Sequence, residues 1–235
     1  MLNVLCRKVL RMFSSLFGSS LSNRSSPAMV TPELALPGRD RPLFELASKH
    51  LVLGTSMLAP FPAGFQSLYI GLGCFWGAEK RFWRVPGVFT TAVGYQGGVT
   101  PNPTYEEVCT GRTGHAENVL VVYDPAIVST YDLLKVFWEN HDPTQGYRQG
   151  NDVGTQYRSA LYWTTPEQAE LAKRTRDAYD EVLRARSYGE VTTEVGSAEG
   201  LPFWYAEPHH QQYLFSQPHG YDCHSETGIA LPALV

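Results

Sequence analysis

The chain has 235 residues and a formal net charge of −4, from 19 basic and 23 acidic side chains. This length suits one large domain with extensions, and a hydrophobic fraction of 43% is enough for a packed core. The acidic balance argues against a nucleic-acid partner. No apolar run reaches the ~18 residues of a membrane-spanning helix, which argues against a membrane protein. The four cysteines, Cys6, Cys74, Cys109 and Cys223, form no Cys-x-x-Cys pair, so they indicate a reducing compartment rather than a disulfide scaffold or a zinc ribbon.

Residues 1–26 have the composition of a targeting sequence. Arg7, Lys8 and Arg11 share one face of a helical wheel, apolar residues share the other, and no acidic residue precedes Glu33. This pattern favours a mitochondrial transit peptide with a Ser-rich linker, and a cytoplasmic pool is a second expected location. The alternatives are an amphipathic surface helix or an N-terminal extension of a cytosolic protein.

The rest of the chain divides into three parts by composition. Residues 27–60 are rich in Pro and Gly and predict an extended arm, residues 61–216 predict the compact domain that carries the chemistry, and residues 217–235 predict a mobile tail that contains Cys223. We therefore expect one domain with a long irregular segment at each end.

Hydrophobic periodicity predicts alternating strands and helices within the compact domain. Strands are expected at 68–72, 88–95, 117–123, 157–163 and 191–195, and helices at 76–84, 104–110, 129–140, 165–186 and 211–215. Capping boxes are expected at Ser129 and Thr165. Because no long helix separates the strands at 88–95 and 117–123, we expect them to pair antiparallel. The predicted fold is α+β, a two-layer α/β sandwich with a mixed, partly antiparallel sheet and a ferredoxin-like core.

Cys74 lies where the first predicted strand gives way to a helix, in the sequence GLGCFWGAE (71–79). Unpaired N–H groups and the positive dipole end at a helix start favour a thiolate, which is the reactive form of cysteine. Phe75 and Trp76 would supply an apolar wall beside it. The alternative is a structural cysteine buried in the core.

Several polar residues are candidates for acid–base chemistry. Glu117 begins a predicted strand near the apolar core, where a carboxyl should have a raised pKa and could act as a general acid; the alternative is a surface salt bridge. Tyr105 and Tyr157 are either phenol donors or residues of the core edge. Asp152 would ordinarily be a turn residue.

Histidines leave other classes of function open. His115 or His141 could form a Cys–His pair with Cys74, as in a hydrolase, or could simply hydrogen-bond to backbone. A non-enzymatic redox sensor or binding module is a further alternative. A metal site is disfavoured, because no standard zinc spacing fits the tail residues His209, His210, Cys223 and His224.

The order of seven short motifs favours one interpretation of the function. They are GCFWG (73–77), PNPTY (101–105), TGHAE (113–117), FWENHDPT (137–144), QGND (149–152), GTQYRS (154–159) and HQQY (210–213). Together they closely resemble the peptide methionine sulfoxide reductase A family, which acts on the S epimer at sulfur. The resemblance covers residues 31–221 and implies the α+β sandwich around a mixed sheet.

The resemblance also implies roles for matching residues. These are the nucleophile Cys74, the S-methyl contacts Phe75 and Trp76, the acid Glu117 that protonates the sulfoxide oxygen, the phenols Tyr105 and Tyr157 that hold this oxygen, and the substrate-binding Asp152. Oxidised proteins and free methionine sulfoxide are the implied substrates. The implied reductant is an external dithiol, thioredoxin, with no cofactor and no metal, and a monomer is the expected state.

The resemblance further implies a second thiol that resolves the oxidised Cys74 as a disulfide. Many family members carry Gly-Tyr-Cys near the C-terminus, whereas this chain inserts Asp222 between Tyr221 and Cys223. Cys223 is the expected resolving cysteine, and thioredoxin would reduce the disulfide. Cys109 is expected in the core, with a resolving role as the alternative. Cys6 would leave with the presequence.

Overall fold

The computed structural model describes residues 27–222 and 225–234, and within them the main element is a mixed sheet. Its strand order is β7-β6-β1-β3-β2-β8, and all neighbours pair antiparallel except β6 and β7, which pair parallel. The strands are β1 (Gln66–Leu72), β2 (Val88–Gln96), β3 (Ala116–Tyr123), β6 (Ser159–Trp163), β7 (Glu194–Ser197) and β8 (Trp204–Tyr205). The predicted mixed sheet and the antiparallel pairing of β2 with β3 are confirmed.

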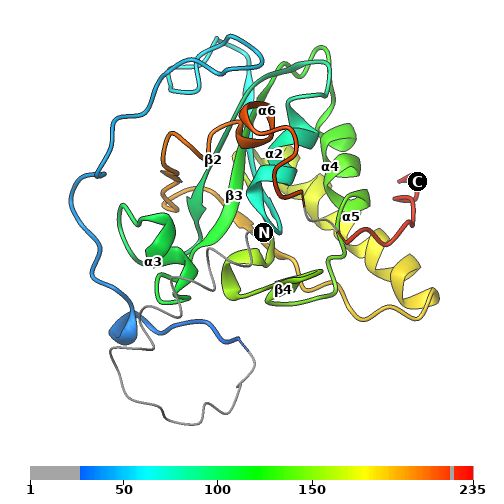
Figure 1. The fold of residues 1–235 in the computed structure, drawn as a ribbon. Coiled ribbons are helices and arrows are strands. Elements are labelled where there is room, and N and C mark those ends of the chain that lie inside the picture. The colour runs from blue at the N-terminus through cyan, green and yellow to red at the C-terminus, as the bar shows by residue number, and fades with distance from the viewer. Residues whose placement is uncertain (1–26, 223–224, 235) are drawn as a thin grey trace.

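Three longer helices pack together against one face of this sheet (Figure 1). They are α2 (Phe75–Phe82), α4 (Thr130–Glu139) and α5 (Pro166–Ala185). The shorter elements are α3 (Tyr105–Cys109), α6 (Tyr213–Ser216), the 3-10 helices η1 (Pro32–Leu34) and η2 (Thr155–Tyr157), and a hairpin of β4 (Arg148–Gln149) and β5 (Asp152–Val153). The α+β class is therefore confirmed.

Both faces of the central strand β3 are covered. Val119 and Val121 join the large core beneath the helices, whereas Leu120 and Val122 join a second cluster with Met57 of the N-terminal arm. Successive side chains of a strand alternate between the faces, so this double burial explains why β3 is buried along its whole length. The same alternation places Glu117 on the helix face.

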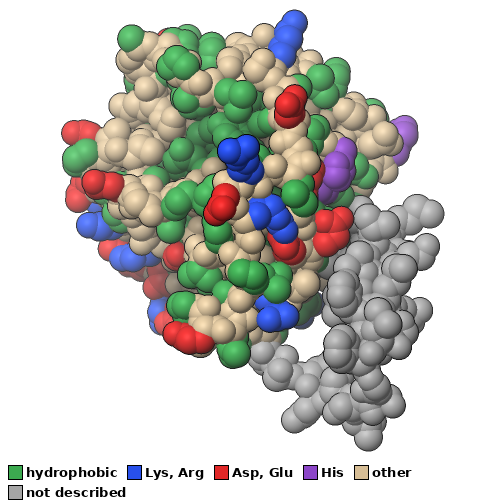
Figure 2. All heavy atoms as spheres, turned by 90° about the vertical axis from the view of Figure 1, so that its left-hand side faces the viewer, with side chains coloured by type: hydrophobic (Ala, Val, Ile, Leu, Met, Phe, Trp, Pro, Cys, Tyr) green, Lys and Arg blue, Asp and Glu red, His purple; other side chains and the backbone are tan. Residues whose placement is uncertain are grey.

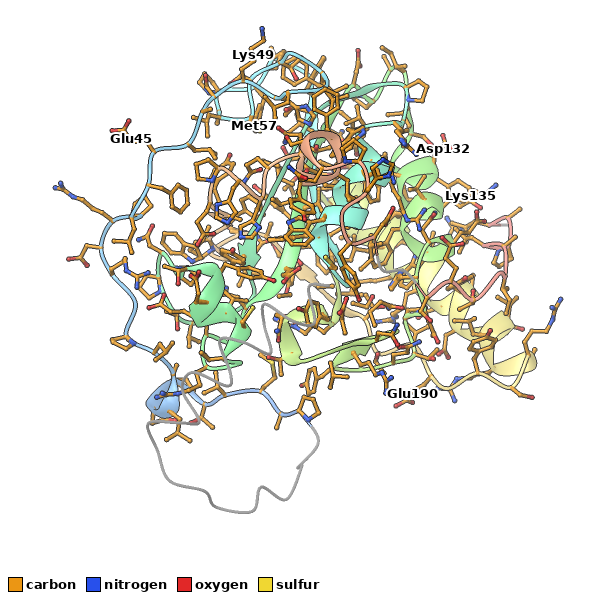
Figure 3. The ribbon with its side chains drawn as sticks, viewed as in Figure 1. Glu45, Lys49, Met57, Asp132, Lys135 and Glu190 are labelled. Carbon is orange, nitrogen blue, oxygen red and sulfur yellow. The ribbon has the colours of Figure 1, made fainter. Side chains whose placement is uncertain are left out.

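The N-terminal arm closes the other face of the sheet. Figure 3 shows Glu45 and Lys49 pointing outward from the arm, and both are exposed, whereas Met57 lies against the sheet with 2% of its surface exposed. Apolar side chains from the arm thus complete the second cluster.

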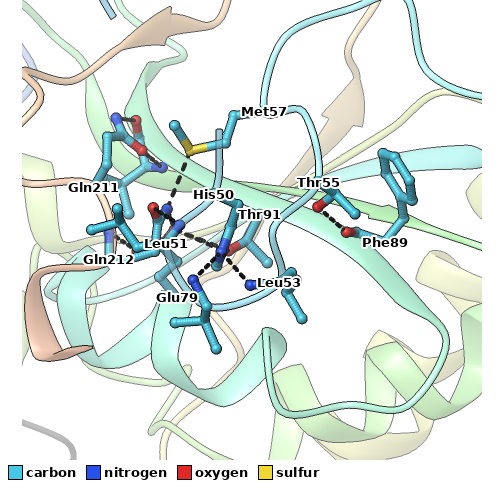
Figure 4. Close-up of polar contacts among 12 residues, drawn as sticks. His50, Leu51, Leu53, Thr55, Met57, Glu79, Phe89, Thr91, Gln211 and Gln212 are labelled. Carbon is cyan, nitrogen blue, oxygen red and sulfur yellow. Dashed lines mark hydrogen bonds and ion pairs between the residues drawn. The ribbon is translucent and has the colours of Figure 1, made fainter. Parts of the chain in front are cut away.

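A buried hydrogen-bond network ties the arm to α2 (Figure 4). His50 Nδ1 accepts from the backbone N–H groups of residues 52–53, both at 3.0 Å, so its proton is on Nε2, which donates to Thr91 Oγ1 at 2.9 Å. Thr91 donates to Glu79 Oε1 at 2.9 Å. Gln212 donates to Glu79 from its backbone at 2.8 Å and from its side chain at 2.7 Å. Glu79 therefore joins four segments that are distant in sequence.

The sequence misplaces some element boundaries. The strand predicted at 191–195 begins at Glu194, because the N–H of Val191 donates to Asp180 and that of Thr192 to the carbonyl of Pro143. The predicted strand at 157–163 begins with η2 and becomes extended at Ser159. The two-residue strands β4, β5 and β8 were not predicted, since two residues give too short a pattern.

The predicted helix caps are confirmed in one case and only partly in another. The predicted capping box at Thr165 is confirmed, with both of its hydrogen bonds formed. Ser129 accepts from the N–H of Asp132, but the Asp132 carboxylate accepts from the Ser129 hydroxyl at 2.6 Å, so only half of the predicted box forms. A further box at the start of α3, between Thr104 and Glu107, was missed although its T-x-x-E spacing is the usual signature.

The described surface mixes charges of both signs. Figure 2 shows acidic and basic side chains close together on the face that carries the arm, with hydrophobic side chains between them. In the described part of the chain, no helix is long and apolar enough to cross a bilayer.

Burial of Glu79 predicts a pH-dependent stability. Burial raises the pKa of this carboxyl to about 7, against about 4.3 in an unfolded chain. Between these values the folded state binds a proton that the unfolded state lacks, so this contribution to the free energy of unfolding falls as pH rises through the window. We expect Glu79→Gln to remove the fall, which amounts to at most about 4 kcal/mol.

The measurement is urea unfolding of both proteins from pH 4.5 to 8. Burial lowers the pKa of His50 and of His115 to about 4, so over this range the folded rings stay neutral while the unfolded chain binds protons below about pH 6.5. These histidines therefore make the free energy of unfolding rise with pH, the opposite trend, in both proteins. The difference between wild type and variant therefore reports Glu79 together with its effect on His50, whose Nε2 lies 4.0 Å from Glu79 Oε1. Parallel curves over the whole range would contradict the assignment.

Candidate active site

The turn from β1 into α2 places Cys74 at the N-cap of α2. Gly73 makes this turn with φ +97°, a region that side chains rarely adopt, and an added Cβ would meet Gln149 at 2.7 Å. Cys74 itself is 4% exposed. The predicted strand–turn–helix setting of this cysteine is therefore present, with the turn held against the β4–β5 hairpin.

Glu117 reaches the start of the same helix from the neighbouring strand. The antiparallel register pairs Ile70 with Val119, so the end of β1 lies beside the start of β3. The backbone N–H of Phe75 donates to Glu117 Oε2 at 3.0 Å, and Glu117 is 1% exposed. A carboxylate thus satisfies one of the otherwise unpaired N–H groups of α2, next to the thiol.

The electrostatics of Cys74 differ from the sequence expectation. Burial raises the pKa of the thiol well above its ordinary value, and the Glu117 carboxylate and Asp152 raise it further. The backbone N–H groups of Trp76 and Gly77 act in the opposite direction. The prediction that the helix start alone favours a thiolate is therefore wrong for this resting site, because desolvation and a nearby anion outweigh two N–H groups.

Two phenols share this environment. Tyr105 is the first residue of α3 and Tyr157 the last of η2, and each is 7% exposed. Burial raises the pKa of Tyr157 far above its ordinary value, and Glu117, Tyr105 and Cys74 add to the shift. Tyr157 is therefore a protonated hydrogen-bond donor at neutral pH. The structure thus brings together the cysteine, the carboxyl and both tyrosines that the sequence singled out.

Asp152 joins the site from β5 and is held by a residue that the sequence did not predict. The Tyr221 hydroxyl donates to Asp152 Oδ1 at 2.9 Å. Asp152 also raises the pKa of Cys74, which places its charge near the thiol. Tyr221 belonged to the tail motif, but nothing in its sequence pattern indicated a partner.

Tail residues that precede and follow the expected resolving cysteine, Cys223, both contact α2. Lys80 pairs with Asp222 at 2.8 Å, and Arg81 pairs with Glu226 at 2.7 Å. Cys223 itself lies outside the described residues, so its role stays a prediction. The tail is thus attached to the helix that begins at Cys74.

An aromatic cluster surrounds the start of α2. Phe75 and Trp76 are 0% and 3% exposed. The Phe75 ring stacks with Tyr105, with centroids 6.4 Å apart, and the Trp76 indole stacks on Tyr213 at 3.8 Å. His210 lies between these groups; the sequence considered it only as a metal ligand, and its place beside the aromatic side chains was not predicted.

The two histidines proposed as partners of Cys74 are engaged elsewhere. His115 Nδ1 accepts from the N–H of Gly98 at 3.0 Å, and its Nε2 donates to the carbonyl of Thr100 at 2.7 Å. His141 contacts the carbonyl of Phe137 at 2.8 Å and the hydroxyl of Ser159 at 2.7 Å. Since both nitrogens of each ring have other partners, the structure gives no support to a Cys–His hydrolase.

The remaining candidate groups show no further site. Among residues 27–222 and 225–234, no three His, Cys, Asp or Glu side chains are arranged to hold a metal ion. Two of the four tail residues considered, Cys223 and His224, lie outside this range. Cys109 is 9% exposed and belongs to the large core, as the sequence predicted.

The charge of Glu117 should govern ionisation of Cys74. We expect Glu117→Gln to lower the pKa of the thiol, because the amide retains an acceptor for the Phe75 N–H and removes the anion. Ultraviolet absorbance of the thiolate, followed against pH and corrected with Cys74→Ser, measures this pKa. An unchanged midpoint would show that Glu117 lies too far from the sulfur to matter.

Comparisons with known proteins agree with this geometry. The family model described as "Peptide methionine sulfoxide reductase" matches residues 66–233. The chain is 63% identical over 198 residues to the "Peptide methionine sulfoxide reductase MsrA" of Rhodospirillum centenum, covering 84% of this chain and 89% of the relative. It is 51% identical over 226 residues to the "Mitochondrial peptide methionine sulfoxide reductase" of Bos taurus, covering 96% of each.

A solved structure of a methionine sulfoxide reductase A also matches this chain. The methionine sulfoxide reductase A of Corynebacterium diphtheriae matches with a TM-score of 0.78 and 48% sequence identity, covering 88% of this chain and 100% of that one. Family model, sequence and fold thus agree, and the chain belongs to the peptide methionine sulfoxide reductase family, oxidoreductases that return methionine sulfoxide to methionine.

Proposed function

We propose that this enzyme reduces the S epimer of methionine sulfoxide, in proteins and as the free amino acid, through the thiol of Cys74. The observation that carries the proposal is the Glu117 carboxyl on the first N–H of α2, 3.0 Å from the Phe75 nitrogen and beside the sulfur. A carboxyl group beside a thiol supports the roles of acid and nucleophile that we assign to them. Oxidised proteins would present the same methionine sulfoxide side chain, so the enzyme would repair oxidative damage.

In the first step, the Cys74 thiolate attacks the sulfoxide sulfur. Glu117 delivers a proton to the sulfoxide oxygen, which Tyr105 and Tyr157 polarise by hydrogen bonding. The protonated oxygen then passes from the substrate sulfur to the Cys74 sulfur: the substrate S–O bond and the transient S–S bond break, a Cys74 S–O bond forms, and methionine leaves reduced while Cys74 is left as a sulfenic acid. Phe75 and Trp76 supply the apolar contact for the S-methyl group, and Asp152 anchors the substrate.

The raised pKa of Cys74 means that the thiolate forms when the Glu117 carboxylate takes up a proton. A protonated Glu117 carries no charge, so it no longer disfavours the thiolate beside it. The acid form of one group and the anionic form of the other therefore stabilise each other. A site whose thiol stays protonated at rest would also resist unspecific oxidation, since the thiolate is the form that oxidants attack.

In the second step, Cys223 attacks the sulfenic acid, water leaves, and a Cys74–Cys223 disulfide forms. Thioredoxin would then reduce the disulfide by thiol–disulfide exchange. The ion pairs of Asp222 and Glu226 with α2 support this assignment, because they hold the flanking tail residues to the helix that carries Cys74. No bound cofactor is needed for this cycle.

Location and assembly follow as parts of the proposal. The basic, acid-free residues 1–26 match a transit peptide, and the bovine relative is named as mitochondrial. These residues lie outside the described structure. We propose a mitochondrial enzyme with a cytoplasmic pool, acting as a monomer.

Racemic methionine sulfoxide with dithiothreitol tests the function. We expect methionine release to stop at about half conversion, when one epimer is exhausted, and Cys74→Ser to release none. Glu117→Gln should slow a single turnover by about 10²–10⁴-fold, although its thiol ionises more readily, because proton delivery is lost. No methionine from the wild type would overturn the proposal, and an undiminished single turnover in Glu117→Gln would remove Glu117 from it.

Cys223→Ser tests the resolving step. We expect a normal single turnover, followed by loss of recycling with thioredoxin, because the sulfenic acid has no partner thiol. Cys109→Ser is the matched control and should recycle like the wild type. Normal recycling by Cys223→Ser would overturn the assignment to Cys223, and loss of recycling in Cys109→Ser would transfer it to Cys109.

A further inference from the structure

A short turn, residues 207–210, lies against the aromatic cluster. It closes with a backbone hydrogen bond from His210 N–H to the Glu207 carbonyl at 2.9 Å. The His210 ring is 3% exposed, and its centroid lies 4.5 Å from that of Tyr105, 5.4 Å from Phe75 and 5.6 Å from Trp76. One histidine therefore contacts three side chains that the mechanism uses.

The hydrogen bond to Trp76 fixes the state of this histidine. The indole N–H can only donate, and it donates to His210 Nδ1 at 3.2 Å. Burial, together with the neighbouring His209, lowers the pKa of His210 to about 3, so the ring is neutral and carries its proton on Nε2. Stacking on Tyr213 restrains the plane of the buried indole, and the directional hydrogen bond at its edge adds a restraint on its rotation within that plane.

The other end of the turn holds the start of α3. The backbone N–H of Tyr105 donates to Glu207 Oε1 at 2.8 Å, and the Tyr95 hydroxyl donates to Glu207 Oε2 at 2.9 Å. Tyr95 pairs with Glu117 in the β2–β3 register, so it lies next to the acid. His210 Nε2 is 3.9 Å from Glu207 Oε2, too far for a hydrogen bond, so the backbone hydrogen bond closes the turn.

We infer that the 207–210 turn is a positioning element that sets the size of the space for the alkyl group on the substrate sulfur. His210 fixes the angle of the Trp76 indole, and Glu207 fixes the position of Tyr105. Neither residue needs to touch substrate. The inference rests on the proposed function and deepens it, because it makes the discrimination among S-alkyl groups depend on a residue outside the reacting set.

Two substitutions of His210 distinguish the effect of its hydrogen bond to Trp76 from the effect of its aromatic ring. His210→Phe keeps a flat aromatic side chain and removes the acceptor, while His210→Asn keeps an acceptor near the position of Nδ1. His209→Asn is the matched control, since His209 is the exposed neighbour in the same turn. The assay compares methionine sulfoxide with ethionine sulfoxide, which carries one more methylene on sulfur.

We expect the wild type to prefer the methyl substrate, because one methylene in a fitted apolar site changes kcat/KM by about 10–200-fold. His210→Phe should lose about tenfold in kcat/KM for methionine sulfoxide, mostly through KM, and most of the methyl-over-ethyl preference. His210→Asn should regain both the kcat/KM for methionine sulfoxide and the methyl-over-ethyl preference. His209→Asn should match the wild type in both quantities. A folded His210→Phe with unchanged preference overturns the inference, as does equal loss in His210→Asn.

A second readout does not require turnover. The indole N–H resonance of Trp76, assigned by its disappearance in Trp76→Phe, should shift and exchange faster with water in His210→Phe, and stay near its wild-type position in His210→Asn. An unmoved resonance in His210→Phe would show that no tether exists. If the wild type reduced no sulfoxide, the proposed function would fail while this spectrum still tested the tether.

Discussion

The hydrogen bond between the Phe75 N–H and the Glu117 carboxyl is the interaction on which the site depends. It completes the first turn of α2, where a negative charge is favourable, and so contributes to the fold. It also brings an acid next to the Cys74 thiol, whose pKa it raises. The capping contact and the proposed catalytic pair are therefore one arrangement of atoms, and a change in protonation of either partner alters the other.

The surrounding structure holds α2 in place from several directions. The Glu79 network fixes its middle to the N-terminal arm and to Gln212 through groups with no exposure, and the 207–210 turn holds the aromatic side chain at its start. The tail contacts differ in kind. Lys80 and Arg81 form partly exposed ion pairs with the tail, and such pairs contribute only about 0–1 kcal/mol each. Beyond these pairs the tail is held more firmly, because Leu231 is 5% exposed within the large core and its backbone N–H donates to Glu139 Oε1 at 2.9 Å.

Much of the fold was predictable because its elements are locally encoded. The longer helices and strands follow hydrophobic periodicity, and the Thr165 capping box sets the start of α5. The errors occur where distant residues decide. The start of β7 depends on contacts of Val191 with Asp180 and of Thr192 with Pro143, and the β4–β5 hairpin is too short to leave a pattern. The half-formed cap at Ser129 reflects the shorter side chain of aspartate, which bonds the hydroxyl instead of the backbone.

By itself, the sequence determined the elements, the strand–turn–helix setting of Cys74 and the set of residues that belong to the family. Only the tertiary structure decided how these residues act on one another. It showed that the Cys74 thiol is disfavoured as an anion at rest, that His115 is committed to backbone groups, and that His210 and Tyr221 support the site. The reason is physical: periodicity and capping depend on residues a few positions apart, whereas desolvation and electrostatic fields depend on whatever the fold packs around a group.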